Sequence, residues 1–345
     1  MQALQLTEFK HPPELREVDD PTPGPGEVLV RVGGAGACHS DLHMLHDFEP
    51  GTVPFETPFT IGHENAGWVE ALGAGVRGLE VGEPVAVYGP WGCGSCPRCR
   101  QGMENYCVRQ AELPVAGGGL GTDGGMAPLL LVPSPRLLVP LHDLDPVDAA
   151  PLTDAGLTPY HAVKRSLDRL VPGSTAVVIG AGGLGHMAIQ ILEHLSAAQI
   201  VAVDTNPEAL HLAQAVGARH ALVPGPEAIA EIRALTGGVG ADVVLDIVGV
   251  EETLALGAAV SRSLGHLTLV GIGGGSYPFG FFTVPYEVSL ASTYWGSLPE
   301  LIEVLALAEA GKVRAHVERY DLADAAQAYE DLAEGKVCGR AVVVP

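Results

Sequence analysis

The chain is poor in basic residues, and it contains no long hydrophobic run. Its 345 residues include 19 lysines and arginines against 41 aspartates and glutamates, which gives a formal net charge of −22. A chain this acidic is repelled by phosphate backbones and anionic lipids, so we expect neither nucleic acid nor a membrane surface as a partner. No apolar stretch in the sequence approaches the length that a bilayer-spanning helix needs.

Cysteine is also scarce, and nothing indicates that the six cysteines form disulfides. The first residues, MQALQLTEFK, lack the basic and apolar regions of a secretory signal, so we expect a cytoplasmic protein. A hydrophobic content of 47% and a charged content of 17% are typical of an ordinary folded chain, and the length suggests two domains. A chain this long buries an ample core without disulfides.

Four of the six cysteines are clustered. Cys93, Cys96, Cys99 and Cys107 follow the spacing C-x2-C-x2-C-x7-C. Four thiolates on two short turns match the closed tetrahedral site of a structural zinc ion. An iron–sulfur cluster is the nearest alternative, but its common ferredoxin spacing has a shorter last interval and a proline after the last cysteine. Here Val108 stands in that place, so the spacing favours zinc.

The hydrophobic pattern of the sequence changes near residue 151. Up to about residue 150, short apolar alternations such as 27–32 and 83–88 are bounded by glycine and proline, which predicts a lobe rich in β-strands and loops. The following part alternates helical and strand-like patterns, which predicts an α/β doubly wound parallel sheet. The expected helices are 157–170, 186–195 and 207–216, and the expected strands are 175–179, 200–203 and 241–247. A last strand, 340–344, is expected to rejoin the first lobe.

A glycine-rich turn follows the first of these strands. The residues 180–185, GAGGLG, match G-x-G-x-x-G and lie between an apolar strand and an amphipathic helix, which is the context of a dinucleotide-binding turn. Gly180 allows the tight turn, Gly182 lets the backbone approach a pyrophosphate, and Gly185 lets the helix pack on the strand. The start of the helix then stabilises the phosphate charge.

Asp204 ends the next expected strand and indicates which dinucleotide binds. Its carboxylate is placed to accept hydrogen bonds from the hydroxyls of an adenosine ribose, and it would repel a 2′-phosphate. No arginine follows in the next four residues, so NAD is favoured over NADP. The alternative is that Asp204 is only a turn residue before Asn206 and Pro207.

A second and sparser metal pattern lies in the first lobe. Cys38 and His63 each follow an expected strand, and one thiolate with one imidazole makes half of a catalytic zinc site. Asp154 is the best candidate for the third ligand. Its alternative role is to cap the helix that begins near Leu157.

With these motifs in order over essentially its whole length, the chain resembles the zinc-dependent medium-chain alcohol dehydrogenases. Within that family it is most similar to bacterial NAD-dependent enzymes of broad specificity that act on secondary alcohols and ketones. The resemblance implies a GroES-like catalytic domain at 1–153 and 291–345, and a Rossmann NAD-binding domain at 154–290. It also implies that Cys38, His63 and Asp154 hold the catalytic zinc. Many relatives have cysteine in place of Asp154, and an aspartate makes the site harder.

The resemblance also implies roles around the catalytic zinc. Asp41 would orient His63 through the other ring nitrogen, and Glu64 would be a carboxylate that binds the metal transiently. The metal would lower the pKa of the substrate hydroxyl. Ser40 would take that proton and pass it through the nicotinamide ribose to His43 and then to water.

Cofactor contacts are implied by the same resemblance. Thr158, Leu184 and Ile272 would lie against the nicotinamide, and His39 and Arg340 near the pyrophosphate. Some relatives have arginine in place of His39, so we expect weaker pyrophosphate binding here. The whole expected set of cofactor-binding residues is His39, Thr158, Gly180, Gly182, Gly183, Leu184, Gly185, Asp204, Ile272 and Arg340.

The substrate pocket is predicted from large apolar side chains that flank the expected zinc. These are Trp91, Leu120, Tyr294 and Trp295, and they favour a hydrophobic alcohol with bulk on both sides of the carbinol carbon. Tyr294 and Trp295 could instead be core or interface aromatics. Cys338 is expected to be a small buried side chain without a catalytic role.

Several alternatives stay open at this point. A polyol, threonine or formaldehyde dehydrogenase of the same architecture is one, and a non-catalytic nucleotide-binding or structural member is another. The presence of Cys38, His63 and Ser40 argues against the latter, and the two metal patterns argue against a zinc-free quinone reductase. We expect a homodimer or homotetramer, because the run 288–295 would form an exposed sheet edge that a second copy can pair with.

Overall fold

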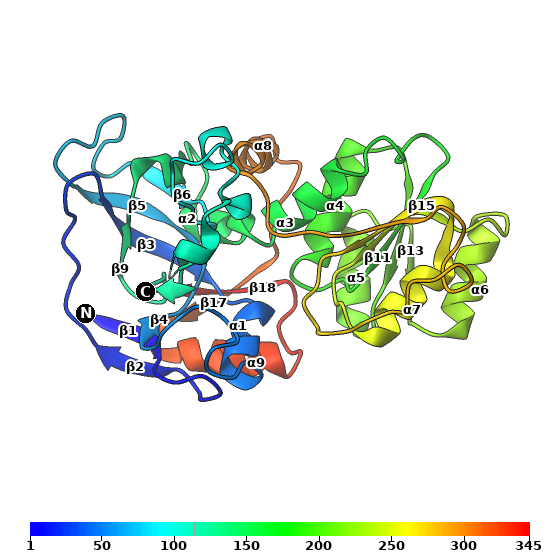
Figure 1. Ribbon diagram of the computed structural model, residues 1–345, viewed down its shortest axis with the longest axis horizontal. Coiled ribbons are helices and arrows are strands. Elements are labelled where there is room, and N and C mark those ends of the chain that lie inside the picture. The colour runs from blue at the N-terminus through cyan, green and yellow to red at the C-terminus, as the bar shows by residue number, and fades with distance from the viewer. Residues whose placement is uncertain (114) are drawn as a thin grey trace. The chain divides into compact units, whose positions relative to one another are not determined.

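The computed structural model describes residues 1–113 and 115–345, and they form two compact units (Figure 1). The first unit comprises Met1–Leu157 together with Gly296–Pro345, and the second comprises Thr158–Trp295. The expected domain borders, after residues 153 and 290, lie a few residues before the borders of these units. The C-terminal segment belongs to the first unit, with its last strand, β18 (Arg340–Val344), in that unit's main sheet.

The first unit is built on mainly antiparallel sheets, in which β17 and β18 pair in parallel, as do β7 and β8. Its largest sheet has the order β10-β6-β5-β3-β18-β17, and β9 also pairs with β3. A smaller sheet has the order β2-β1-β4, and β7 pairs with β8. The bounds of these strands are β1 Gln2–Leu6, β2 Glu14–Glu17, β3 Val28–Gly36, β4 Phe59–Thr60, β5 Glu64–Leu72, β6 Pro84–Val87, β7 Gly117–Gly118, β8 Gly121–Thr122, β9 Leu129–Val132, β10 Leu138–Pro140 and β17 Val317–Asp321.

Helices in the first unit are short and lie around the sheets. They are α1 (His39–His46), α2 (Pro146–Ala149), α8 (Leu298–Glu309) and α9 (Ala325–Ala333). The sequence signals the start of α8 clearly, because Ser297 and Glu300 form a reciprocal capping box and Pro299 follows within the first turn. Figure 1 shows α1 and α9 beside each other, and residues of the two helices are in contact.

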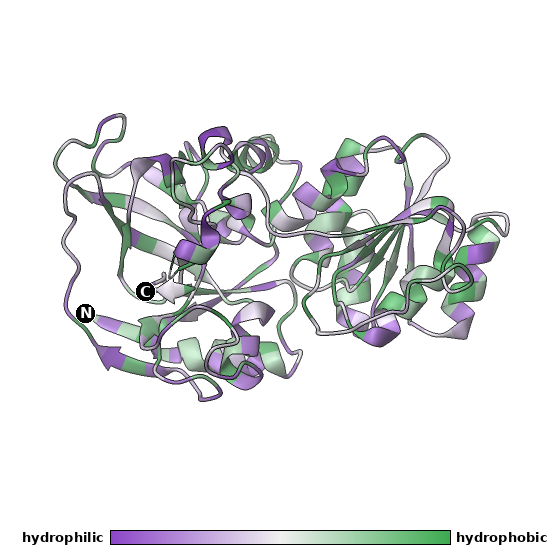
Figure 2. Ribbon diagram, in the orientation of Figure 1, coloured by the Kyte–Doolittle hydropathy of each residue, from purple (hydrophilic) through white to green (hydrophobic). Residues whose placement is uncertain are grey.

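The second unit is a doubly wound parallel sheet of order β13-β12-β11-β14-β15-β16. Its central strands are hydrophobic along most of their length (Figure 2), because helical crossovers cover both faces of such a sheet. The strands are β11 Thr175–Ile179, β12 Gln199–Val203, β13 His220–Leu222, β14 Ala241–Asp246, β15 Ser261–Leu269 and β16 Ser289–Ser292. The helices are α3 Leu157–Lys164, α4 Gly185–Leu195, α5 Pro207–Ala215, α6 Pro226–Leu235 and α7 Glu251–Val260. The predicted fold class, α/β with a β-rich lobe and a Rossmann sheet, is confirmed.

Two details of this unit differ from the prediction. The helix expected over 157–170 ends at Lys164 and continues as turns, where the Ser166 hydroxyl bonds back to the carbonyl of Ala162. The elements β13, α6, α7 and β15 were not predicted from the sequence. In the part of the chain that the structure describes, no helix is long and apolar enough to cross a membrane.

Candidate functional site

The sparse metal pattern of the first unit is brought together at one end of the β3–β5 pair. Cys38 follows β3 and caps α1, whereas His63 directly precedes β5 and Glu64 is its first residue. The register pairs Gly36 with Glu64, so the two segments meet at this point. Asp154 arrives from a 3-10 helix over Ala150–Thr153. Ligand atoms of Cys38, His63, Glu64 and Asp154 all lie within 4.8 Å of one another.

The spacing of these atoms fits a zinc ion. The His63 Nε2 atom is 3.5 Å from Asp154 Oδ2, and the Cys38 Sγ atom is 3.8 Å from the same oxygen. Zinc bonds of about 2.0–2.3 Å at tetrahedral angles place neighbouring ligand atoms roughly 3.3–3.8 Å apart. One thiolate, one imidazole and one carboxylate leave a fourth position for a small molecule, as a catalytic site requires. The Asp154 side chain is therefore directed to the cluster, as the ligand hypothesis predicts.

Asp41 holds the ring of His63 from the opposite side. The His63 Nδ1 atom donates to Asp41 Oδ1 over 2.9 Å, and both side chains are buried. Because the carboxylate can only accept, Nδ1 carries a proton, and Nε2, which faces Asp154 and Cys38, is the nitrogen left for a metal ion. Burial lowers the pKa of His63, but the charge of Asp41 and hydrogen bonds to neighbours outweigh it and raise the pKa well above its usual value. The ring is thus oriented for metal binding.

Glu64 is paired with Arg340, the first residue of β18. Two guanidinium nitrogens of Arg340 donate to the two carboxylate oxygens, one of them over 2.8 Å, and the Ala155 N–H donates over 3.2 Å. Burial raises the pKa of Glu64 to about 7, although Arg340 opposes the shift. Since Arg340 is 1% exposed, its guanidinium is committed to this pair. The sequence did not predict the pair, and the expected contact of Arg340 with a pyrophosphate stays a prediction.

Two polar residues of α1 lie where a proton relay would need them. The Ser40 hydroxyl is 3.3 Å from His63 Nε2, beside the expected metal position. One turn further, the His43 Nδ1 atom donates to the exposed carboxylate of Asp47 over 2.6 Å, and its ring stacks on Phe48. Asp47 therefore fixes the tautomer of His43 and leaves Nε2 able to accept a proton. Sequence analysis did not identify Asp47, although its place four residues after His43 on a helix was a usable signal.

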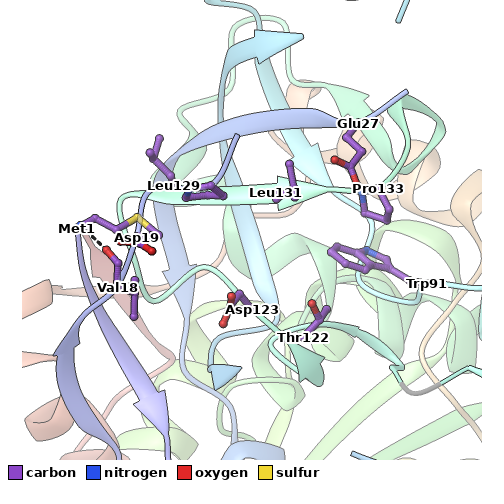
Figure 3. Close-up of a pocket in the computed structure, with 11 residues that line it drawn as sticks. Met1, Val18, Asp19, Glu27, Trp91, Thr122, Asp123, Leu129, Leu131 and Pro133 are labelled. Atoms are coloured by element: carbon purple, nitrogen blue, oxygen red, sulfur yellow. Dashed lines mark hydrogen bonds between the residues drawn. The ribbon is translucent and has the colours of Figure 1, made fainter. Parts of the chain in front are cut away.

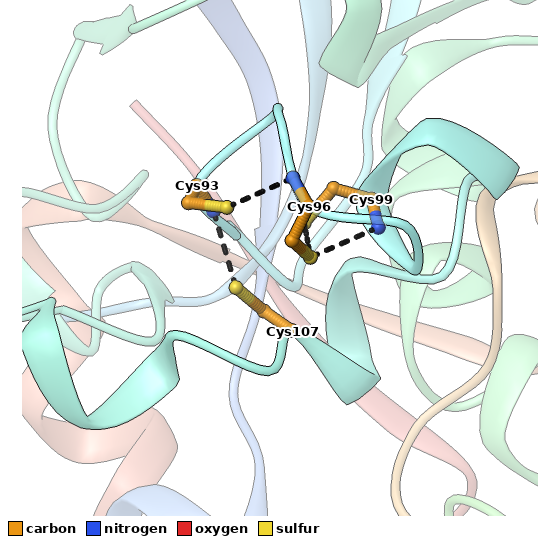
Figure 4. A group of neighbouring side chains, drawn as sticks. All are labelled: Cys93, Cys96, Cys99 and Cys107. Carbon is orange, nitrogen blue, oxygen red and sulfur yellow. Dashed lines mark hydrogen bonds between the residues drawn. The ribbon is translucent and has the colours of Figure 1, made fainter.

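The four clustered cysteines converge as predicted (Figure 4), and in the described chain, which contains all six cysteines, none forms a disulfide. The Cys96 and Cys99 sulfurs are 3.5 Å apart, close to the separation of about 3.8 Å that zinc–sulfur bonds of about 2.3 Å imply. Backbone N–H groups donate to the sulfurs of Cys93, Cys96 and Cys107 over 3.3–3.5 Å. The bond from the Ser95 N–H is the main cause that lowers the pKa of Cys93 to about 6, which favours a thiolate.

The cysteine cluster is tied to the rest of the first unit by a buried ion pair. Arg136 donates to the carbonyl of Cys99 over 2.8 Å and pairs with Glu104, which is 1% exposed. A Cβ at Gly92 would lie 2.6 Å from the Cys99 sulfur, so the chain passes this sulfur too closely for another residue. The donor set and the close backbone fit a structural zinc ion with four protein ligands.

In the second unit, the glycine turn has the shape of a pyrophosphate cradle. Gly180 has a φ of +89°, which other residues rarely adopt. A Cβ at Gly185 would lie 1.9 Å from the carbonyl oxygen of Gly180, whereas a Cβ at Gly182 would point into open space within 4 Å. Gly183 completes the turn, and α4 begins at its end. The open space at Gly182 and the start of α4 fit an incoming phosphate group.

Asp204 stands directly after β12, beside this turn. Its Oδ2 atom accepts from the Ala181 N–H over 2.6 Å, and its Oδ1 atom accepts from the Asn206 N–H over 2.8 Å. The carboxylate is partly exposed and has further lone pairs for ribose hydroxyls. The hydrogen bond to Ala181 links Asp204 to the glycine turn. A residue that only shaped the local turn before Asn206 and Pro207 would not need this bond.

The remaining predicted cofactor residues lie on separate segments of the two units. In the second unit, Thr158 is buried in α3, Leu184 caps α4, and Ile272 follows β15 and is 56% exposed. In the first unit, His39 is the exposed first residue of α1. Their contacts with a cofactor stay predictions.

The aromatic pocket candidates are distributed over both units. Trp91 is buried, donates its indole N–H to the Tyr88 carbonyl over 3.0 Å, and lines a cavity of about 220 Å³ in the first unit (Figure 3). None of the four side chains of the candidate metal cluster, Cys38, His63, Glu64 and Asp154, lines this cavity. Leu120 is half-buried in the turn between β7 and β8. Tyr294 and Trp295 end the second unit with their rings edge to face. The substrate pocket therefore stays a prediction.

Comparison with known proteins gives the family. The model of the alcohol dehydrogenase GroES-like domain matches residues 24–143, and that of the zinc-binding dehydrogenase domain matches residues 183–310. A relative from Sulfurisphaera tokodaii, named NAD-dependent alcohol dehydrogenase, is 38% identical over all of both chains. A relative from Saccharolobus solfataricus, named D-arabinose 1-dehydrogenase (NADP(+)), is 36% identical and covers 99% of this chain and 97% of its own.

Solved structures agree with this. The structure of acetophenone reductase from Geotrichum candidum in complex with NAD has a TM-score of 0.86 and 30% identity, over 100% of this chain and 97% of that one. The fold and the two metal clusters thus define a two-domain, zinc-type dehydrogenase. The chain belongs to the zinc-dependent alcohol dehydrogenase family with a GroES-like domain, and the predicted resemblance is confirmed.

Proposed function

We propose that the protein interconverts hydrophobic secondary alcohols and ketones by hydride transfer to and from NAD, with zinc held by Cys38, His63 and Asp154. The observation that carries this proposal is the convergence of these three side chains, 116 residues apart at the extremes, with an oriented imidazole among them. The enzyme class predicted from the sequence, an alcohol dehydrogenase that uses zinc and NAD, is confirmed by the family and its named members. The residue roles and the secondary-alcohol substrate are our proposal.

The protein's own side chains would handle the proton. When bound, zinc supplies a Lewis acid that makes the substrate hydroxyl more acidic. Ser40 stands beside the ligand atom of His63 and takes the hydroxyl proton. His43 would accept the proton next and return it to water, because Asp47 holds Nδ1 and leaves Nε2 to accept. When bound, NAD would supply the hydride acceptor, which is the cofactor's own chemistry.

Glu64 is the second carboxylate beside the proposed metal position. Its oxygens are bound by Arg340 and by the Ala155 N–H, and they lie within ligand distance of the same cluster. For Glu64 to bind the metal it has to leave Arg340, and that costs the energy of a buried ion pair. We therefore propose that Glu64 is a transient ligand and that Cys38, His63 and Asp154 are the permanent ones.

The secondary-alcohol class is supported by the likeness to a structure titled acetophenone reductase, and by the apolar pocket candidates. It is tested by comparing kcat/KM for NAD-linked oxidation of 1-phenylethanol, cyclohexanol, ethanol, a polyol, threonine and formaldehyde. The proposal requires the two secondary alcohols to have the highest kcat/KM values of this series. A polyol, threonine or formaldehyde that exceeds them would replace the substrate class and leave the metal site intact.

A sugar is the second candidate substrate, since one full-length relative is named for D-arabinose and NADP(+). Asp204 argues against the cofactor part of that alternative, because its carboxylate would face the 2′-phosphate of NADP. D-arabinose with each cofactor belongs in the same substrate series. Turnover of D-arabinose with NADP above that of 1-phenylethanol with NAD would favour the sugar dehydrogenase.

Replacement Asp204→Asn is expected to relax the choice of cofactor. The amide removes the negative charge, so NADP is no longer repelled and the ribose hydroxyls lose a charged acceptor; its one oxygen keeps one of the two backbone bonds, and its NH2 cannot accept the other. We expect kcat/KM for NAD to fall about ten-fold and the NADP-to-NAD ratio to rise by more than that. Steady-state kinetics with both cofactors measure this. The control Asp168→Asn, on an exposed carboxylate of the same unit, should change neither value, and an unchanged ratio in Asp204→Asn would refute the role.

We also propose that two copies pair through the edge strand β16. This strand is one end of the described sheet order and contains Leu290, which is 41% exposed; Phe281 and Phe282, which precede the strand in the chain, are 73% and 90% exposed. Exposed edges and apolar patches favour pairing. Light scattering on Leu290→Lys is expected to show a smaller particle than the unmodified protein, and an unchanged mass would contradict this interface. The cytoplasm is the compartment we propose.

A further inference from the structure

A line of hydrogen bonds runs from helix α9 to the metal cluster. The Tyr329 hydroxyl donates to Asp41 Oδ2 over 2.9 Å, and Asp41 Oδ1 accepts from His63 Nδ1 over 2.9 Å. Tyr329 and Asp41 are 288 residues apart in the sequence. Tyr329, Asp41 and His63 are 2%, 0% and 2% exposed, so bulk water does not substitute for any of these bonds.

The Asp41 carboxylate is held by three donors. One is the phenol of Tyr329, one is the imidazole of His63, and one is the backbone N–H of Cys38 over 3.1 Å. Two of these donors belong to residues of the metal cluster itself. Tyr329 is the only one of the three that lies outside the cluster and its immediate chain, so it anchors the carboxylate from the far side.

The phenol is not needed for packing at this position. Tyr329 is buried on the same face of α9 as Ala325, Ala328 and Leu332. A phenylalanine would fill the same space and would have no hydroxyl to bury. Burying a hydroxyl costs little free energy only when the hydroxyl has a hydrogen-bond partner. The hydrogen bond to Asp41 is that partner.

We propose that Tyr329 is a positioning residue of the catalytic metal site, whose phenol fixes the Asp41 carboxylate that orients His63. This rests on the proposed ligand set of Cys38, His63 and Asp154. It gives α9 a role in metal retention, because α9 supplies the donor that holds Asp41 while the ligands come from residues 38–154. Partners of this kind keep a ligand at its angle, and their removal typically costs about 10–100-fold in metal affinity or activity.

The test is the rate at which the purified zinc-loaded protein gives up its catalytic zinc to an excess of chelator. Tyr329→Phe leaves Asp41 Oδ2 with one backbone donor and frees the carboxylate to rotate. We expect zinc release from this site to be about ten-fold faster than in the unmodified protein. With cobalt in the same site, the visible absorption spectrum should shift, since the ligand geometry becomes less fixed. The slower zinc of the four-cysteine cluster serves as an internal reference.

Two further variants separate positioning from packing. In Tyr320→Phe, a phenol that donates to Asp331 over 3.2 Å is lost, and Asp331 is not part of the metal cluster. Its zinc release and cobalt spectrum should match the unmodified protein. In Asp41→Asn, release should be at least as fast as in Tyr329→Phe, and the double variant should be no faster than Asp41→Asn alone, since Tyr329 acts through Asp41.

Three results would overturn this role. In the first, Tyr329→Phe changes neither the rate of zinc release nor the cobalt spectrum. In the second, the effects of Tyr329→Phe and Asp41→Asn on zinc release add in the double variant. In the third, the unmodified protein binds no metal at Cys38, His63 and Asp154. Neither readout needs a substrate. A protein whose zinc release depends on Tyr329 and Asp41 as expected, but which oxidises no alcohol, would thus reject the proposed reaction and retain the positioning role.

Discussion

Replacement Cys38→Ser is expected to remove the catalytic zinc and to lower kcat/KM for alcohol oxidation by about a thousand-fold or more. The thiolate is the softest of the three proposed ligands, and the Lewis acid that they hold supplies several kcal/mol to the reaction. Each factor of ten in rate corresponds to about 1.4 kcal/mol, so a loss of this size follows from loss of the metal. Elemental analysis should give one zinc per subunit in place of two.

Cys338→Ser is the matched control, because Cys338 is partly exposed and belongs to neither cysteine-containing metal cluster. It should keep two zinc ions and full activity. If Cys38→Ser kept both zinc ions and an unchanged kcat/KM, Cys38 would not be a ligand. If it lost zinc and kept its activity, the metal would not take part in the reaction.

Replacement Cys99→Ser is expected to have its largest effect on stability. Cys99 is 1% exposed, its carbonyl accepts from Arg136, and burial raises the pKa of its thiol to about 12, so only a bound metal ion keeps it as a thiolate. Loss of the four-cysteine zinc removes the cross-link that closes residues 93–107. With a cost of roughly 3 kcal/mol and about 2–4 °C per kcal/mol, we expect Tm to fall by about 6–12 °C.

Calorimetry with the zinc content of the same samples measures this effect. Cys99→Ser should lose one zinc and retain turnover at temperatures well below its Tm, which distinguishes it from Cys38→Ser. Loss of zinc with an unchanged Tm would show that the cluster does not stabilise the fold. Two zinc ions retained would exclude Cys99 as a ligand.

Features encoded within short stretches of the chain were predictable from the sequence. The glycine turn 180–185 and the cysteine spacing each depend on local backbone shape, and both predicted arrangements are present. The strands 175–179 and 340–344 have the predicted bounds, since continuous apolar runs between turn residues are typical of buried strands.

Contacts between distant segments were harder to predict from the sequence. The pairing of Glu64 with Arg340 spans 276 residues and that of Tyr329 with Asp41 spans 288, so both depend on how β18 and α9 return to the first unit. No local pattern marks either partner. Asp154 was already the best candidate for the third ligand from the sequence, and the family resemblance implied the same position.

In the second unit, the missed elements have physical reasons of their own. The strand β13 has only three residues, His220–Leu222, all partly buried, so it lacks the apolar run of a central strand. The helix α7 passes directly into β15 at Ser261 without turn residues between them. No turn residue therefore marks the point at which the hydrophobic period changes from that of a helix to that of a strand.

The most direct test of the proposed site is NADH formation by the purified protein with NAD and 1-phenylethanol, measured before and after treatment with a chelator and after zinc is restored. We expect steady NADH formation that stops when the zinc of Cys38, His63 and Asp154 is removed and returns with added zinc. An unchanged rate in protein shown to have lost that zinc would contradict the proposed chemistry. No NADH from folded protein that carries both zinc ions would contradict the secondary-alcohol substrate.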